Sequence, residues 1–154
     1  MENLSYPIGK FSFKQETGEN EIQQWIQDIE QHPKNLQAAV QGLSNEQLNT
    51  PYRDGGWTVC QVVHHLADSH MNAYIRFKLA LTEHHPTIKP YEEKRWAEME
   101  DAKVLPIDIS ISILTPLHIR WTNMLKKITN EELERTVFHP ESKRDMSVKF
   151  LLAL

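Results

Sequence analysis

Histidine is the residue type in this chain best suited to chemistry, and it is most concentrated in residues 58–70. The chain has eight histidines in 154 residues, and His64, His65 and His70 all fall within this stretch. A neutral imidazole offers a nitrogen lone pair to ions such as zinc, which take three protein ligands in catalytic sites and keep one position open. The stretch is therefore the first candidate for a metal site.

Spacing limits how many of these rings could bind one ion. Two of the three histidines are adjacent, so on a regular helix their side chains point about 100° apart. A pair on one helix face needs His-x-x-x-His spacing, which occurs nowhere in the chain. Further ligands would have to come from another element. Four of the other five histidines offer little, because His84, His85 and His139 are expected in loops and His118 is expected to face inward as a neutral ring.

The histidine stretch is predicted to open a long helix. Thr58 and Gln61 have the spacing of a capping box, in which each side chain bonds the other residue's backbone N–H. Apolar residues then recur at the helical period, which predicts a helix over residues 59–82. Pro86 follows closely and favours an end to the helix there.

The two most interesting histidines fall on different faces of that helix. His70 lies at the centre of the predicted buried face, whereas His65 lies on a polar flank that it shares with Ser69 and Arg76. One interpretation is that the flank faces solvent and that His70 is a core histidine hydrogen-bonded to a neighbour. The other is that the flank lines a cleft between helices and that His65 meets a metal ion. The helical pattern alone leaves both open.

Helical periods extend over most of the remaining chain. They predict a helix from about Glu19, kinked or broken at Pro33, and another over residues 107–128 in which Pro116 is out of place. Residues 1–18 show no such period, so we expect an extended arm followed by one domain over residues 19–154.

A charged segment lies between the predicted helices, at residues 91–102. We expect it to form a lid or strap over the domain, with Trp96 and Met99 as its inward-facing residues.

A weak internal repeat predicts the architecture. Residues 43–48 (LSNEQL) are echoed by residues 128–133 (ITNEEL), and each copy is followed by a loop and a new helix cap, at Thr58 and Ser147. Two such units predict an all-α fold, an antiparallel four-helix bundle. The last helix would have only two turns before Leu154, against about 24 residues in its counterpart. We therefore expect the chain to be truncated and the missing part to be helical.

Composition excludes several functional classes. The net charge is −4 and the charges are interspersed, which argues against nucleic-acid binding and gives no reason to propose membrane binding. No apolar run approaches the roughly 20 residues that span a bilayer, and the amino terminus does not resemble a signal peptide. A single cysteine, Cys60, excludes an internal disulfide and is typical of a reducing compartment. We expect a cytoplasmic protein in which Cys60 is a small buried residue.

The block around the histidines resembles a known family. Residues 52–59 (YRDGGWTV), 61–72 (QVVHHLADSHMN) and 74–78 (YIRFK) resemble the YfiT branch of the DinB/YfiT-like superfamily, as do residues 3–9 and 117–122. The resemblance covers essentially the whole chain. It implies a four-helix bundle that is often dimeric, so a homodimer is expected.

The resemblance also implies a metal site. In that family three histidines hold a divalent ion, one on the second helix and a pair four residues apart on the last. The family's first ligand directly precedes Leu-Ala-Asp, which makes it His65 here, and two further histidines are expected beyond Leu154. Asp68 is a candidate for orienting a ligand imidazole. Zinc is the first candidate for the ion and nickel the second.

The activity that the resemblance implies is metal-dependent hydrolysis, because an ion held by three histidines lowers the pKa of bound water to about 7. Close relatives transfer the thiol bacillithiol, and a metal ion that binds a thiol also deprotonates it. We therefore consider three functions for the chain: a hydrolase of a small-molecule substrate, a metal-dependent bacillithiol S-transferase, or a non-catalytic helical binding or scaffold protein. No residue is assigned as the catalytic acid or base.

Overall fold

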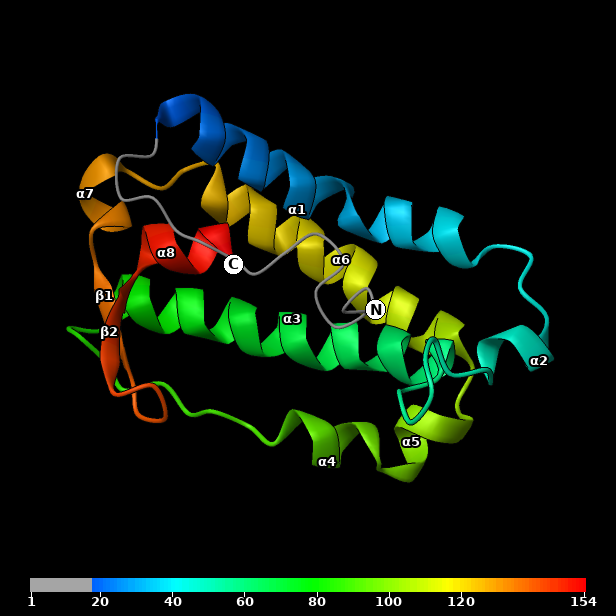
Figure 1. Cartoon of the computed structure of the whole chain (residues 1–154). Helices are drawn as coiled ribbons and strands as arrows, with labels where there is room; N and C mark the ends of the chain where they lie inside the picture. Colours follow the sequence, from blue (N-terminus) through cyan, green and yellow to red (C-terminus); the bar gives the residue numbers. More distant parts are fainter. Residues whose placement is uncertain (1–17) are drawn as a thin grey trace.

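Three long helices and one short helix form the bundle that the repeat predicts. The structure is a computed structural model and describes residues 18–154; the arm expected at residues 1–18 lies outside them except for Gly18. Figure 1 shows α1, α3 and α6 running side by side, with α8 against α1 and α3 at one end. The bundle helices are α1 (Glu19–Val40), α3 (Val59–Thr82), α6 (Ile107–Leu125) and α8 (Val148–Ala153).

Shorter elements connect the bundle helices. The two echoed motifs each form a single capped turn, α2 (Asn45–Leu48) and α7 (Asn130–Leu133), and each has a complete capping box. The capping box of Thr58 and Gln61 at the start of α3 is also present. The sequence signals for helix starts are therefore confirmed.

The all-α prediction is wrong in one detail, because a small hairpin precedes the last helix. Strands β1 (Thr136–His139) and β2 (Arg144–Ser147) pair antiparallel. Val137 and Met146 face each other in this register and both are buried. This buried cross-strand pair explains why the segment expected to be a loop forms two paired strands.

The segment between α3 and α6 corrects a second prediction. It forms α4 (Glu93–Ala97) and α5 (Glu100–Val104), which lie along α3. Trp96 and Met99 are 39% and 59% exposed, so they do not face inward; Ala97 and Ala102 do, at 1% each. Small side chains fit because the backbone comes close to α3, where Gln61 donates a hydrogen bond to the Ala97 carbonyl.

Neither helix proline interrupts its helix. Pro33 lies inside a continuous α1 and Pro116 inside a continuous α6. Of the two outcomes expected at Pro33, a break is therefore wrong, and a kink stays a prediction.

The main core lies where α8 and the hairpin close the end of the bundle. Phe77, Leu125, Val137 and Val148 are almost fully buried there. Over residues 18–154, no helix is both long enough and apolar enough to cross a membrane.

Candidate functional site: a histidine-lined cavity

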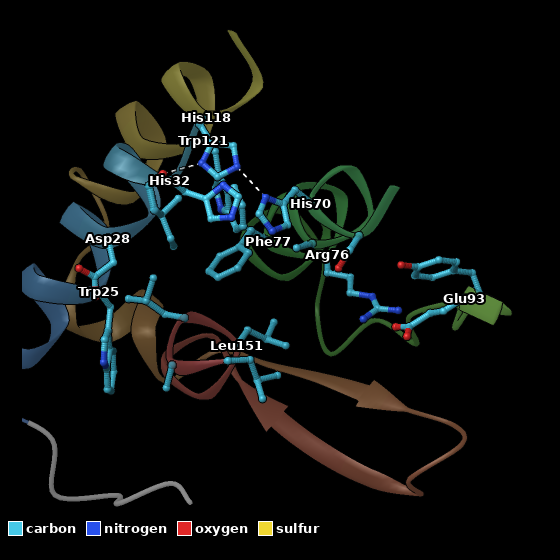
Figure 2. Close-up of a pocket in the computed structure, with 17 residues that line it drawn as sticks. Trp25, Asp28, His32, His70, Arg76, Phe77, Glu93, His118, Trp121 and Leu151 are labelled. Atoms are coloured by element: carbon cyan, nitrogen blue, oxygen red, sulfur yellow. Dashed lines mark hydrogen bonds between the residues drawn. The ribbon is translucent and has the colours of Figure 1, made fainter. Parts of the chain in front are cut away.

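A cavity of about 400 Å³ lies between the bundle helices. Its walls come from α1, α3, α6 and α8, and residues just before and within α4 close one side. Figure 2 shows three imidazole rings gathered at one end of it and Arg76 and Glu93 at the other. The cavity therefore combines nitrogen donors with charged side chains.

The three rings belong to His32 of α1, His70 of α3 and His118 of α6. One ring nitrogen from each lies within 4.8 Å of the others. His32 stacks on His118 with ring centroids 5.3 Å apart and meets His70 edge-on at 4.6 Å. Three different helices thus bring together one group of possible metal ligands.

Hydrogen bonds determine where the protons are on two of these rings. His118 Nδ1 lies against the backbone carbonyl of Ile29, which can only accept, so Nδ1 carries the proton. In a neutral ring Nε2 then has a lone pair. His70 Nδ1 lies 2.7 Å from that Nε2 and must be the donor. His70 Nε2 is consequently left with a lone pair.

Pro33 explains why the Ile29 carbonyl is available to His118. In a helix the N–H of residue 33 would bond the carbonyl of residue 29, but proline has no N–H. The carbonyl of Ile29 instead accepts from His118 Nδ1, on a different helix. The helix-breaking residue in α1 thereby supplies the group that orients His118.

Burial keeps the three rings neutral. It lowers the pKa of His32 and of His118, although the Ile29 carbonyl partly offsets the effect for His118. For His70, burial followed by the neighbouring histidines lowers the pKa to about 3. Neutral imidazoles are the form that binds metal ions.

The other end of the cavity is polar. Arg76 is half-buried, its Nε has no hydrogen-bond partner within residues 18–154, and its guanidinium donates a long bond of 3.4 Å to the Lys89 carbonyl. Burial raises the pKa of the Tyr91 hydroxyl, which lies near Ser69 and Arg76.

His65, the ligand that the family resemblance implies, lies outside this cluster. It is half-buried, and its ring packs on Trp57 with centroids 4.8 Å apart. Neither ring nitrogen hydrogen-bonds to another described residue. Ser69, one turn further along α3, lines the cavity, so His65 lies on the helix flank just beyond the cavity wall.

The two remaining candidates from the sequence, His64 and Asp68, also lie outside the histidine cluster. His64 is buried, with 6% exposure, and bonds Ser110 at 2.6 Å and the Leu105 carbonyl at 2.8 Å. Asp68 is half-buried, and desolvation followed by the charge of Asp101 raises its pKa. Within the described chain its carboxylate has no hydrogen bond to an imidazole.

The cluster could not be found from spacing. His32, His70 and His118 are far apart in sequence, and only the bundle brings them together. One part was predictable: His70 is a buried-face histidine bonded to a neighbour, and His118 faces inward with 2% exposure. The signal for His32 was only its position next to Pro33.

Comparisons with known proteins agree with this fold. A family model described as the DinB superfamily matches residues 28–154. A Bacillus cereus (strain 03BB102) protein named "Putative metal-dependent hydrolase" is 56% identical over 142 residues, which cover 92% of this chain and 82% of that protein. A protein of the same name from Bacillus anthracis (strain CDC 684) matches equally well, with the same identity and coverage.

A solved structure matches almost the whole chain. It is YfiT from Bacillus subtilis, described as "a probable metal-dependent hydrolase with an unusual four-helix bundle topology". The two align with a TM-score of 0.96 and 48% identity, over 99% of this chain and 87% of the other.

Proposed function

Because the chain belongs to the DinB superfamily, we propose that it is a divalent-metal-dependent hydrolase of the YfiT type acting on a small molecule. The observation that carries the proposal is the match to YfiT over nearly the whole chain. A divalent ion bound by histidines supplies a water molecule with a pKa near 7, which makes hydroxide available for hydrolysis.

His65 is the ligand that we propose for this ion. Its ring is half-buried and held by Trp57, so it is partly immobilised before an ion binds. Its nitrogens are free of hydrogen bonds to described residues, which leaves a lone pair for coordination. One histidine does not hold an ion, and the resemblance places the two further ligands beyond Leu154.

The cavity would bind the substrate next to this ion. Ser69 on the flank of His65 and Arg76 two turns further on both line it. Apolar side chains form the rest of the wall near Phe77 and Trp121. This combination suits a small substrate with an apolar body and a polar group.

The experiment begins with the coding sequence downstream of Leu154. An in-frame His-x-x-x-His within about a dozen codons supports the proposal. The protein encoded up to the stop codon is then expected to bind about one Zn²⁺ or Ni²⁺ per subunit at His65 and to hydrolyse members of an ester and amide panel only when metal-loaded. His65→Ala should abolish this activity, whereas His84→Ala, an exposed loop histidine, should not.

The same assay separates hydrolysis from thiol transfer. Bacillithiol and an electrophile are added in place of the ester, and formation of the conjugate is measured in wild type and His65→Ala. Conjugation without hydrolysis would favour the transferase. If neither reaction depends on metal or on His65, the proposed enzyme function is wrong and a helical binding protein is the better description.

A further inference from the structure

The cluster of His32, His70 and His118 contains a ligand set that the proposed hydrolase ion does not use. His70 lies five residues after His65 on α3, which places it about 7.5 Å further along the axis and roughly 140° around it. His65 is not part of the group whose nitrogens lie within 4.8 Å. We propose that the cluster is a second divalent-cation site, which binds a Zn²⁺-like ion and links α1, α3 and α6.

His118 is already arranged as a metal ligand. Metal-binding histidines commonly donate their second N–H to a backbone carbonyl, which fixes the tautomer and the ring orientation. His118 Nδ1 has this bond to Ile29. Its Nε2 lone pair therefore points toward the other two rings rather than toward solvent, and this orientation is set before an ion binds.

His32 has an unsatisfied nitrogen at the same place. Its Nδ1 is buried and has no hydrogen-bond partner within residues 18–154. A buried polar atom without a partner is costly and is uncommon in folded proteins. An ion coordinated by this nitrogen would give it the partner that it lacks.

The cavity wall carries both acidic and basic side chains. Asp28 and Glu93 line it with carboxylates, and Arg76 is its one basic side chain among the described residues. Asp28 lies one turn before His32 on α1, and Figure 2 shows both on the cavity side of the helix. Both acidic residues are exposed, and Figure 2 shows Glu93 beside Arg76, away from the three rings. The case for a cation therefore rests on the three imidazoles.

The donor type selects the class of ion. Three imidazole nitrogens suit Zn²⁺, Ni²⁺, Co²⁺ or Cu²⁺, whereas Mg²⁺ and Ca²⁺ prefer oxygen ligands. With metal–nitrogen bonds of about 2.0–2.1 Å and tetrahedral angles, ligand nitrogens are about 3.3 Å apart. His70 Nδ1 and His118 Nε2 are 2.7 Å apart, so the ion would take the place of the proton between them, with that proton moving to His70 Nε2, and would separate the two nitrogens by about 0.6 Å.

The experiment uses the 154-residue chain freed of metal with a chelator. Zn²⁺ is titrated by calorimetry, and the melting temperature is measured with and without one equivalent. We expect one ion per chain and a clear rise in melting temperature for both wild type and His65→Ala. His32→Ala should weaken the affinity at least tenfold and remove most of the rise, while its circular dichroism stays helical. His84→Ala is the matched control and should behave as wild type.

A measurement on the wild type does not depend on the folding of any variant. X-ray absorption of the one-equivalent Zn²⁺ complex should show three imidazole ligands. Absence of tight binding, fewer than three imidazoles, or full affinity in His32→Ala would overturn the second site. Loss of all binding in His65→Ala would also overturn it, because the ion would then belong to the site proposed for hydrolysis. Failure of the hydrolase proposal leaves these results unchanged, since none of them measures activity.

Discussion

The Nδ1 atom of His70 on α3 lies 2.7 Å from the Nε2 atom of His118 on α6. This contact joins two long helices through a single shared proton, and the carbonyl of Ile29 on α1 continues it to a third. Such a chain of bonds requires a neutral His118 ring, because a proton added to His118 Nε2 removes the acceptor of the His70 bond. The stability of the bundle and the protonation of its histidines are therefore linked.

Acid should destabilise the metal-free chain well above the pH at which carboxylates titrate. His32, His70 and His118 have pKa values lowered by burial, to about 3 for His70. The unfolded chain, with histidine pKa values near 6.5, binds more protons below that pH, so the free energy of unfolding should fall as the pH drops from about 6.5 toward 3. Urea unfolding at pH 7.5 and pH 5 measures it. Between these two pH values, the free energy of unfolding should fall less in His70→Gln than in wild type, because the variant lacks one of the three histidines. An equal fall would contradict the prediction that His70 contributes to the pH dependence.

The two helix prolines should respond differently to replacement by alanine. A proline inside a helix costs about 3 kcal/mol relative to alanine, but Pro33 is buried and the carbonyl it frees already accepts from His118. Pro33→Ala should therefore change the free energy of unfolding by less than about 1 kcal/mol. Pro116 is exposed, and Pro116→Ala should raise the free energy of unfolding by about 2 kcal/mol. The increase is smaller than the full value of about 3 kcal/mol because alanine makes the unfolded chain more flexible. Urea unfolding measures both variants, and an equal increase in the free energy of unfolding for the two would contradict this prediction.

Two of the three capping boxes in the described chain allow a matched test of helix starts. Thr58 caps the 24-residue α3, whereas Ser44 caps the four-residue α2. Thr58→Ala should lower the free energy of unfolding by about 1 kcal/mol. Ser44→Ala should cost less, because a single exposed turn can fray without disturbing the core. Thermal or urea unfolding compares them, and a larger loss for Ser44→Ala would be the opposite of this expectation.

Cys60 should be inert in the folded chain. It is 6% exposed, its thiol faces the carbonyls of Ala102 and Leu105, and burial raises its pKa. Since the thiolate is the reactive form, alkylation by iodoacetamide at pH 8 should be at least about 100-fold slower than in urea. Similar rates in both conditions, measured by mass spectrometry, would show that the thiol is accessible.

Local signals predicted the elements well, because they depend on residues close together in sequence. The caps expected at Thr58 and Ser147 both formed, and the period from Val59 ended at Thr82 as expected. The hairpin was missed, since four-residue strands give almost no periodic signal. Trp96 was misplaced because a large aromatic residue suggests burial, whereas the close packing against α3 admits only alanine.

The site was harder to predict, for a physical reason. A motif such as His-x-x-x-His can be read from sequence because one helix positions both rings. His32, His70 and His118 are positioned by the packing of three helices, which spacing does not encode. His65 is still identified by resemblance, and its role as a ligand remains a prediction.

The contact between His118 and Ile29 also affects the order in which the chain folds. Residues 29 to 33 of α1 lack one of their own helical bonds and obtain its replacement from α6, about 90 residues away in sequence. A peptide containing only α1 should therefore fray at this turn. The amino-terminal helix becomes continuous only after it docks, so the first stable nucleus is expected to involve α3 and α6, with α1 joining them later.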